Sequence, residues 1–336
     1  MAEPPDAELV AALRAAVDGE VRAGEPLSAH TTLRVGGPAA ALVRAESVED
    51  LAGLAQVCRE RARPWLVLGR GSNLLVADAG WPGVVVTLGA AFRGITRDGA
   101  ALIAGGAEPM PALAVRAEHE GLAGVAFGVA IPGTVGGAVR MNAGAHGGQM
   151  SDVLEWAEVV RLAGGGARER IGAAELELGY RHSALPHDAV VVSARLGLAP
   201  AGPEALAGDM TEMRRWRRAH QPVSEPSCGS VFANPVGDSA GRLIEAAGLV
   251  GHRVGGARVS DRHANFIVVA RGSPASDVHR VLRDVQQRVA EVHGVALRPE
   301  VVLAGFADAD REGGAEPADR PEAGASLPRP GGATGR

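Results

Sequence analysis

Two glycine-rich stretches of the chain have a main chain that could hold an anionic ligand. The longer one, Gly128–Gly148, contains seven glycines and one charged residue, Arg140. The shorter one, Gly69–Asn73, reads G-R-G-S-N and follows an apolar run. Because no side chains stand in the way, the N–H groups of such a main chain can reach a diphosphate or the polar edge of a flat ring. Both stretches are candidate cofactor-binding segments, and for each of them alone a purely structural loop is the alternative.

The composition of the 336-residue chain limits its chemistry. All 34 basic residues are arginine, and the absence of lysine removes Schiff bases, Walker-type phosphate loops and lysine general bases. The net charge of −5 gives no general attraction to nucleic acid or to an anionic membrane. Cys58 and Cys228 are too few for a disulfide framework or a cysteine-rich zinc site. We therefore expect no bound metal and no nucleic-acid partner.

Two further features of the sequence bear on location. The N-terminal segment is acidic and contains proline, unlike a secretory signal. Residues 121–139 carry no charge, but one proline and six glycines would break a membrane-spanning helix there. We expect a cytoplasmic protein that does not insert into a membrane.

Apolar periodicity predicts mixed helices and strands around the two glycine-rich stretches. Ser47 and Asp50 form a capping-box pattern at the start of a helix. The apolar face of that helix consists of Leu51, Leu54, Ala55 and Cys58. Further helices are predicted over residues 6–22, 108–120 and 173–178. Strands are predicted over residues 65–69, 84–88, 101–104, 153–162 and 190–198, and residues 27–38 are expected to be extended.

The last third of the chain has its own pattern of elements. A helix is predicted over residues 203–220, and its last turns carry Arg214, Arg215, Arg217 and Arg218. These arginines form either a solvated helix end or a face that attracts anions. A loop over residues 221–235 leads into a short strand. Beyond it, helices are predicted over 239–247 and 276–293, and strands over 265–270 and 300–303.

Seven motifs occur in a fixed order along the chain. They are T-T-L-R-V-G-G, L-G-R-G-S-N-L-L, I-P-G-T-V-G-G-A-V-R-M-N-A-G-A, G-Y-R-H-S, P-S-C-G-S-V-F-A-N-P, A-G-L-V-G-H-R-V-G-G-A-R-V-S-D-R-H-A-N-F and R-P-E-V. Together they resemble the UDP-N-acetylenolpyruvoylglucosamine reductases, flavoenzymes of peptidoglycan precursor synthesis, over roughly residues 28–305. The ordered set makes the resemblance specific, whereas one motif alone would not.

The resemblance implies an α+β fold. Residues 28–200 would form a two-lobed FAD-binding domain of the vanillyl-alcohol-oxidase type, and residues 201–306 a smaller α+β substrate-binding domain. Residues 1–27 would be a helical segment, and residues 307–336 are expected to be disordered because they contain almost no large apolar side chains. The implied reaction uses NADPH and non-covalently bound FAD to reduce a UDP-sugar enolpyruvyl ether to UDP-N-acetylmuramate. A monomer is expected.

The same motifs imply roles for individual residues. Arg181 would polarise the substrate carboxylate with Glu300 as its acidic companion, and Ser230 would donate the proton. A serine can act as an acid only toward a strongly basic centre in a dry pocket. For each of these three residues a structural role is the alternative. The implied FAD contacts are Gly69, Gly71, Ser72, Asn73, Leu74, Ile131, Gly133, Gly136 and Gly144, and the implied substrate contacts are Tyr180, Asn234 and His263.

The sequence also departs from the family pattern. Ala233 and Val250 stand where a basic residue is usual, which could weaken contacts to the substrate diphosphate unless the arginines at 214–218 substitute. His146 stands where tyrosine is common, and the short link from Ser183 to the strand at residue 190 indicates the shorter class of the family. Two alternatives are an FAD-dependent oxidase of a sugar lactone or alcohol and an inactive nucleotide-sugar-binding relative. A serine hydrolase is weaker, since no G-x-S-x-G motif is present.

Overall fold

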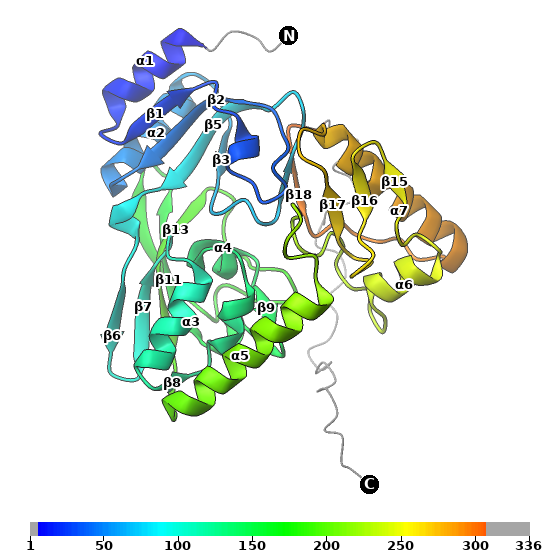
Figure 1. Ribbon diagram of the computed structural model, residues 1–336. Coiled ribbons are helices and arrows are strands. Elements are labelled where there is room, and N and C mark those ends of the chain that lie inside the picture. The colour runs from blue at the N-terminus through cyan, green and yellow to red at the C-terminus, as the bar shows by residue number, and fades with distance from the viewer. Residues whose placement is uncertain (1–5, 307–336) are drawn as a thin grey trace.

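The computed structural model describes residues 6–306, which form two lobes and a C-terminal unit (Figure 1). The first lobe is a sheet with two helices packed on one face. Its strands, in spatial order, are β1 (Glu20–Ala23), β2 (Ala39–Ala45), β5 (Trp81–Leu88) and β3 (Trp65–Val67). β1 runs antiparallel to β2, whereas β2 and β3 run parallel to β5. The helices are α1 (Ala7–Ala16) and α2 (Val48–Glu60).

The ends of these helices follow from local hydrogen bonds. As predicted, Ser47 caps α2, because its Oγ accepts from the N–H of Asp50 at 3.0 Å. The capping box is not completed, since the Asp50 carboxylate instead accepts from the main-chain N–H groups of Glu46 and Asp18 at 2.7 and 2.8 Å. The predicted apolar face of α2 is buried. α1 ends at Ala16, earlier than predicted, because residues 20–23 pair with β2.

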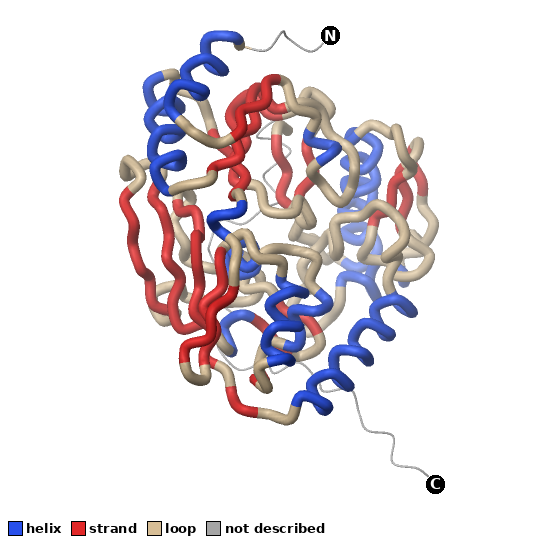
Figure 2. The backbone as a smooth tube through the Cα atoms, turned by 60° about the vertical axis from the view of Figure 1, so that its left-hand side comes forward, coloured by secondary structure: helices blue, strands red, loops and turns tan. Residues whose placement is uncertain are grey.

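The second lobe is a five-stranded antiparallel sheet with helices on its inner face (Figure 2). Its strands, in spatial order, are β12 (Ala167–Gly172), β11 (Leu154–Arg161), β13 (Ala189–Gly197), β7 (Ala101–Gly105) and β6 (Ile95–Asp98). The helices α3 (Met110–His119) and α4 (Val135–Arg140) bury Leu113 and Val139 against this sheet. α3 is followed by Gly121 at φ +64°, the predicted stop. Short strand pairs also join β8 (Leu122–Ala123) to β14 (Ala199–Pro200), and β9 (Gly144–Ala145) to β10 (Gly148–Gln149).

Two predictions in these lobes are wrong. Residues 173–178 form successive turns instead of a helix, and the carbonyl of Leu176 accepts from Ala184 N–H, outside the segment, at 2.7 Å. The bonds found there are single turns, such as Leu176 N–H to Ala173 O at 3.2 Å. The strand predicted over 65–69 is buried only at Leu68, while Val67 of β3 is 39% exposed.

The C-terminal third begins with the long helix α5 (Pro203–His220), which has the predicted bounds. Met210 of α5 packs against Ala114 and Val129 of the second lobe. A small sheet of β15 (Arg253–Val254), β16 (Ala257–Val259) and β17 (Ile267–Val269) follows, with the helices α6 (Ala240–Ala246) and α7 (Ala275–His293). α7 ends at Gly294, whose φ of +68° suits glycine. The domain boundary at residue 200 stays a prediction.

The end of the described chain returns to the first lobe. β18 (Val302–Ala304) pairs in parallel with β4 (Leu74–Val76), which directly follows the Gly69–Asn73 loop. The strand predicted after residues 221–235 is absent, and Phe232 makes only an isolated bridge to Pro299. Phe232 nevertheless lies in the same apolar core as Leu33 of the first lobe. The C-terminal unit is therefore anchored beside the shorter glycine-rich stretch.

The predicted disordered tail at 307–336 lies outside the described residues. Among residues 6–306, no helix has both the length and the apolar character needed to cross a bilayer. The same residues contain no cluster of three His, Cys, Asp or Glu side chains able to hold a metal ion.

Candidate active site

A large cavity of about 2310 Å³ lies where the two lobes and the C-terminal unit meet. The first lobe contributes the Gly69–Leu74 segment, and the second lobe contributes residues 130–134 and Arg181. The C-terminal third contributes Arg217, residues 221–230 and Glu300. Both glycine-rich stretches thus face one cavity, together with the residues expected to do chemistry.

The shorter glycine-rich loop can be built only with glycine at two positions. Gly71 has φ +59°, and a Cβ there would lie 2.2 Å from the carbonyl oxygen of His30. A Cβ on Gly69 would lie 2.8 Å from Oγ1 of Thr134. Thr134 belongs to the longer glycine-rich stretch, where its hydroxyl accepts from the N–H of Gly137 at the start of α4. The two stretches therefore meet at a contact that leaves no room for a side chain.

The longer stretch is more regular than predicted. Instead of one loop wrapped along a ligand, it contains the end of a 3₁₀ turn at Ala126–Ala130, the helix α4 and the β9–β10 hairpin. The helix forms because Val135, Ala138 and Val139 have helical spacing and bury themselves in the second-lobe core. The residues of this stretch that line the cavity lie before, within and after α4: residues 130–134, 137–138, 140–141 and 143–146.

The open part of these loops fits a flavin dinucleotide. Within residues 6–306, the main-chain N–H groups of residues 69–73 have no hydrogen-bond partner, although Gly71 is buried. Main-chain donors that lack a protein partner at a glycine-rich turn suit a diphosphate. On the facing loop, a Cβ on Gly133 would be in ordinary van der Waals contact with Ser72 Oγ at 3.6 Å, so the two loops approach closely at this point of the wall. Asn73 differs from expectation, because its amide donates to the main-chain oxygen of Glu300 at 3.0 Å.

The structure brings Arg181, Ser230 and Glu300 to the same cavity. Arg181 Nε donates to Glu300 Oε1 at 2.8 Å, and its Nη2 donates to Gly144 O at 3.3 Å. The main-chain N–H of Glu300 donates to Val231 O at 2.7 Å, which places Glu300 beside the residue that follows Ser230. Burial raises the pKa of Glu300, and the Arg181 charge and hydrogen bond oppose that rise. Glu300 is thus the acidic companion of Arg181 in this structure, and the roles of the two residues stay predictions.

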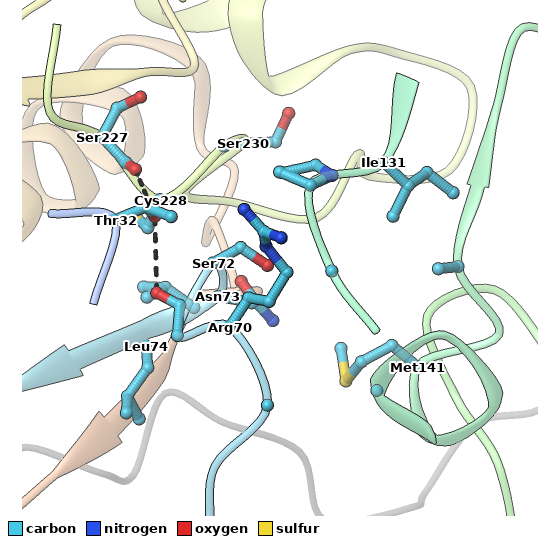
Figure 3. Close-up of a pocket in the computed structure, with 18 of the residues that line it drawn as sticks. Thr32, Arg70, Ser72, Asn73, Leu74, Ile131, Met141, Ser227, Cys228 and Ser230 are labelled. Carbon is cyan, nitrogen blue, oxygen red and sulfur yellow. Dashed lines mark hydrogen bonds between the residues drawn. The ribbon is translucent and has the colours of Figure 1, made fainter. Parts of the chain in front are cut away.

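Ser230 lies among the residues that line the cavity, with Arg70 and Ile131 also facing it (Figure 3). Its Oγ has no hydrogen-bond partner among residues 6–306, so the hydroxyl is available to a ligand. Gly229 before it has φ +78° and nothing within 4 Å of a Cβ. The neighbouring thiol, Cys228, is buried, and burial raises its pKa to about 12. A thiolate nucleophile at this position is therefore excluded near neutral pH.

The end of α5 supplies a cation and an aromatic group to the cavity. Of the four arginines predicted there, Arg217 lines the cavity, whereas Arg214, Arg215 and Arg218 do not. Arg217 Nε donates to Gln221 Oε1 at 3.2 Å, and burial lowers the pKa of its guanidinium. Trp216 stacks on His220 at 4.5 Å between ring centroids and meets the edge of His146 at 5.2 Å. Arg217 is thus the arginine of this group that is placed to meet an anion in the cavity.

Three predicted ligand contacts stand outside the cavity wall. Gly136 packs inside the second lobe, where a Cβ would lie 3.1 Å from Gly106 O. Tyr180 is 49% exposed, and its hydroxyl accepts from the N–H of Asn234, which does line the cavity. His263 packs edge-on against Phe266 at 4.8 Å, and burial lowers its pKa. Their roles remain predictions.

The other predicted residues line the cavity: Gly69, Gly71, Ser72, Asn73, Leu74, Ile131, Gly133, Gly144, Asn234, Arg181, Ser230 and Glu300. Among the wall residues to which sequence reasoning gave no role are Thr32 and Arg70. Both stand inside motifs that were recognised, T-T-L-R-V-G-G and L-G-R-G-S-N-L-L, so their place in a ligand-facing segment was the available signal. Ala233 and Val250 do not line the cavity.

Comparison with known proteins agrees with this geometry. Residues 39–169 match the model of an FAD binding domain, and residues 221–304 match the C-terminal domain of UDP-N-acetylenolpyruvoylglucosamine reductase. The chain is 45% identical over 292 residues to the UDP-N-acetylenolpyruvoylglucosamine reductase of Heliobacterium modesticaldum, covering 86% of this chain and 92% of that one. For the Bacillus subtilis enzyme, the identity is 39% over 289 residues, covering 85% and 95%.

A solved structure supports the same relationship. The crystal structure of UDP-N-acetylenolpyruvylglucosamine reductase (MurB) from Thermus caldophilus superimposes with a TM-score of 0.72 at 39% identity, covering 85% of this chain and 98% of that one. The predicted α+β fold is therefore confirmed: a two-lobed FAD-binding domain is followed by a smaller α+β domain. The chain belongs to the UDP-N-acetylenolpyruvoylglucosamine reductase family.

Proposed function

We propose that this chain is an FAD-containing, NADPH-dependent oxidoreductase. It reduces the enolpyruvyl group of UDP-N-acetylenolpyruvoylglucosamine to give UDP-N-acetylmuramate for peptidoglycan. The observation that carries the proposal is that Ser230 and the Arg181–Glu300 pair face one cavity with the partnerless N–H groups of residues 69–73. When bound there, FAD would take hydride from NADPH and deliver it to the methylene carbon of the enolpyruvyl group.

Arg181 would stabilise the negative charge that develops during reduction. Addition of hydride to the methylene carbon pushes an electron pair toward the adjacent carbon and its carboxylate. Glu300 and Gly144 O occupy two directions around the guanidinium, at 2.8 and 3.3 Å. The remaining N–H groups of Arg181 are left for the substrate carboxylate, and the two protein contacts hold the guanidinium plane still.

Ser230 would supply the proton that completes the reaction. Ser230 lines the cavity, and its hydroxyl has no partner within the described chain, so it is available to protonate a carbanion-like carbon of the substrate. Since serine is a poor acid in water, this step requires a strongly basic carbon and a pocket from which substrate and cofactor exclude water. The pocket is closed to water once both ligands are bound, whereas the basic carbon exists only after hydride has been added.

Arg217 would bind the diphosphate of the substrate. It lines the cavity, whereas residues 233 and 250, which are often basic in this family, are Ala233 and Val250 here and stand outside the wall. Tyr180, Asn234 and His263 are the further substrate contacts that we propose. A monomer in the cytoplasm is part of the same proposal.

The proposal is tested by following the flavin absorbance anaerobically. We expect purified protein to be yellow, NADPH to bleach the colour, and the enolpyruvyl sugar nucleotide to restore it. UDP-N-acetylglucosamine, which lacks the enolpyruvyl group, is the control and should leave the flavin reduced. Protein that cannot take up FAD, or reduced protein that the enolpyruvyl substrate does not reoxidise, would overturn the proposal. Bleaching by a sugar lactone or alcohol without NADPH would support an oxidase instead.

A further inference from the structure

Thr32 joins three parts of the cavity wall that are distant in sequence. Its main-chain N–H donates to Gly71 O at 3.1 Å, which ties it to the shorter glycine-rich loop. Its Oγ1 donates to Ser227 O at 2.6 Å, across a sequence separation of 195 residues (Figure 3). Gly71 O also lies 3.4 Å from this Oγ1, but a hydroxyl has one proton, and the shorter contact to Ser227 is the stronger one.

We propose that Thr32 is a positioning residue for Ser230. In this interpretation its hydroxyl holds the Ser227–Ser230 segment against the Gly69–Asn73 loop, so that the Ser230 hydroxyl stays above the reacting carbon. The inference rests on the proposed function, because it assumes that Ser230 donates the proton. It adds a residue of the wall whose hydroxyl is bonded to the protein and acts through the segment that carries the donor.

The segment that carries Ser230 needs such an anchor. At its far end, Val231 is fixed on both sides, since its N–H donates to Asn265 O at 2.9 Å and its carbonyl accepts from Glu300 N–H at 2.7 Å. At its near end, Val269 N–H donates to Pro226 O at 3.2 Å and Cys228 is buried in the apolar core, which hold the segment to the C-terminal unit, while the bond from Thr32 to Ser227 O ties it to the first lobe. Between these anchors lies Gly229, at φ +78° and with open space around it. Without the Thr32 bond, the main chain can pivot at Gly229 and turn the Ser230 hydroxyl away.

The consequence for rate should exceed the consequence for stability. One hydrogen bond is a small part of the stability of a chain of this size. In contrast, displacing a reacting group by about 1 Å can slow a reaction by about 100-fold. Loss of the Thr32 hydroxyl should therefore leave a folded, flavin-binding protein in which one chemical step is slow.

The test measures the two half-reactions separately by anaerobic stopped flow. Thr32→Val keeps the shape of the side chain and removes the donor, whereas Thr32→Ser keeps the donor. We expect Thr32→Val to slow reoxidation by the enolpyruvyl substrate about 10- to 100-fold, with reduction by NADPH changed less than about threefold. The solvent deuterium isotope effect on reoxidation should rise, because proton transfer becomes limiting. Thr32→Ser should restore the rate to within about threefold.

Thr87→Val is the matched control. Thr87 Oγ1 also donates to a main-chain carbonyl, Val43 O at 3.4 Å, but within the first-lobe sheet. This variant should leave both half-reactions and the isotope effect unchanged. The inference is overturned if Thr32→Val slows both half-reactions equally, slows neither of them, or loses its flavin. It is also overturned if reoxidation is no faster in Thr32→Ser than in Thr32→Val. A wild-type protein that the enolpyruvyl substrate fails to reoxidise would instead reject the proposed function.

Discussion

Arg181 and Arg217 both line the cavity, yet their surroundings differ. Arg181 is paired with the Glu300 carboxylate at 2.8 Å, so its charge is largely balanced inside the protein. Arg217 has no carboxylate within ion-pair distance among residues 6–306, and Nε contacts only the neutral amide of Gln221. A paired guanidinium is held in place to act on charge that appears during a reaction. An unpaired one in a half-buried position gains most when an anionic ligand arrives.

Arg140 shows a third way to bury a guanidinium. Its side chain donates to the carbonyl oxygens of Leu185, Pro186 and Ala189, at 3.4, 3.0 and 2.6 Å. These contacts satisfy the donors with main-chain oxygens, so Arg140 fastens α4 to the segment before β13. Burial alone therefore does not mark a binding arginine. What distinguishes Arg217 is that most of its donors have no protein partner while it faces the cavity.

The largest effect is expected for Ser230→Ala, which removes the proton donor next to the paired arginine. Reoxidation by the enolpyruvyl substrate should slow by about 10³-fold, within the range of general acid catalysis, while reduction by NADPH keeps its rate. Anaerobic stopped flow measures both steps. Thr96→Ala, at an exposed position of β6 that does not line the cavity, is the control. An unchanged reoxidation rate would assign the proton to another group or to water.

A somewhat smaller effect is expected for Arg181→Gln. The variant removes the charge that stabilises the developing carboxylate dianion, and reoxidation should slow by about 10²- to 10³-fold. Because glutamine leaves the Glu300 carboxylate half-buried without its cation, the pKa of Glu300 should rise further above its ordinary value. Substrate affinity should change less than the rate. A variant with normal rate but weak binding would remove the distinction drawn between Arg181 and Arg217.

For Arg217→Gln we expect the opposite pattern, in which substrate affinity changes more than the catalytic rate. We expect the KM for the UDP-sugar substrate to rise about tenfold, the value of one charge-assisted hydrogen bond, with kcat changed less than about threefold. The KM of the wild-type protein should also rise with salt more steeply than that of the variant. Arg215→Gln is the matched control, since Arg215 lies on the same helix but its side chain is 78% exposed. Equal effects of the two variants would mean that only net charge matters.

The bounds of a helix are predicted best from the sequence where proline or glycine marks its ends. Helix α5 begins after Gly202 at Pro203, and α7 ends at Gly294, so their bounds were predicted to within one residue. Residues 173–178 were predicted wrongly, because a short apolar pattern outweighed the flanking glycines. The helix α4 was missed for the opposite reason: the glycines at 136 and 137 concealed the helical spacing of its apolar side chains.

The site was harder to predict because its contacts span the chain. The Arg181–Glu300 pair joins residues 119 positions apart, and only the resemblance to a family placed them together. Thr32 was overlooked because its role depends on a carbonyl of Ser227, and any residue type carries a carbonyl. The parallel pairing of β18 with β4 likewise leaves no local signal, since each strand alone is a short apolar run. Long-range pairing of this kind decides which side of the cavity each arginine occupies.

The smallest expected effect concerns the pKa of His146. Although the residue is exposed overall, packing removes water from part of its ring and lowers its pKa below the ordinary value of 6.5, and the Arg217 charge lowers it further. A folded-state pKa below the unfolded one means that the stabilising contribution is present above pH 6.5 and is lost as the pH falls through the folded-state pKa. Arg217→Gln should raise the pKa of His146 toward 6.5 and reduce this loss. Arg181→Gln should leave it unchanged.

NMR titration of the imidazole signals measures this pKa, and His146→Gln assigns the resonance among the ten histidines. Thermal melts between pH 5 and 8 follow the linked change in stability. The decisive addition is a UDP-sugar ligand: an anion bound at Arg217 offsets its charge, so the ligand should raise the pKa of His146 in the wild-type protein. In Arg217→Gln the cation at residue 217 is absent, so the same ligand should raise the pKa of His146 by a smaller amount. A ligand-induced shift of equal size in both proteins would place the phosphates away from Arg217 and return this arginine to a structural role at the end of α5.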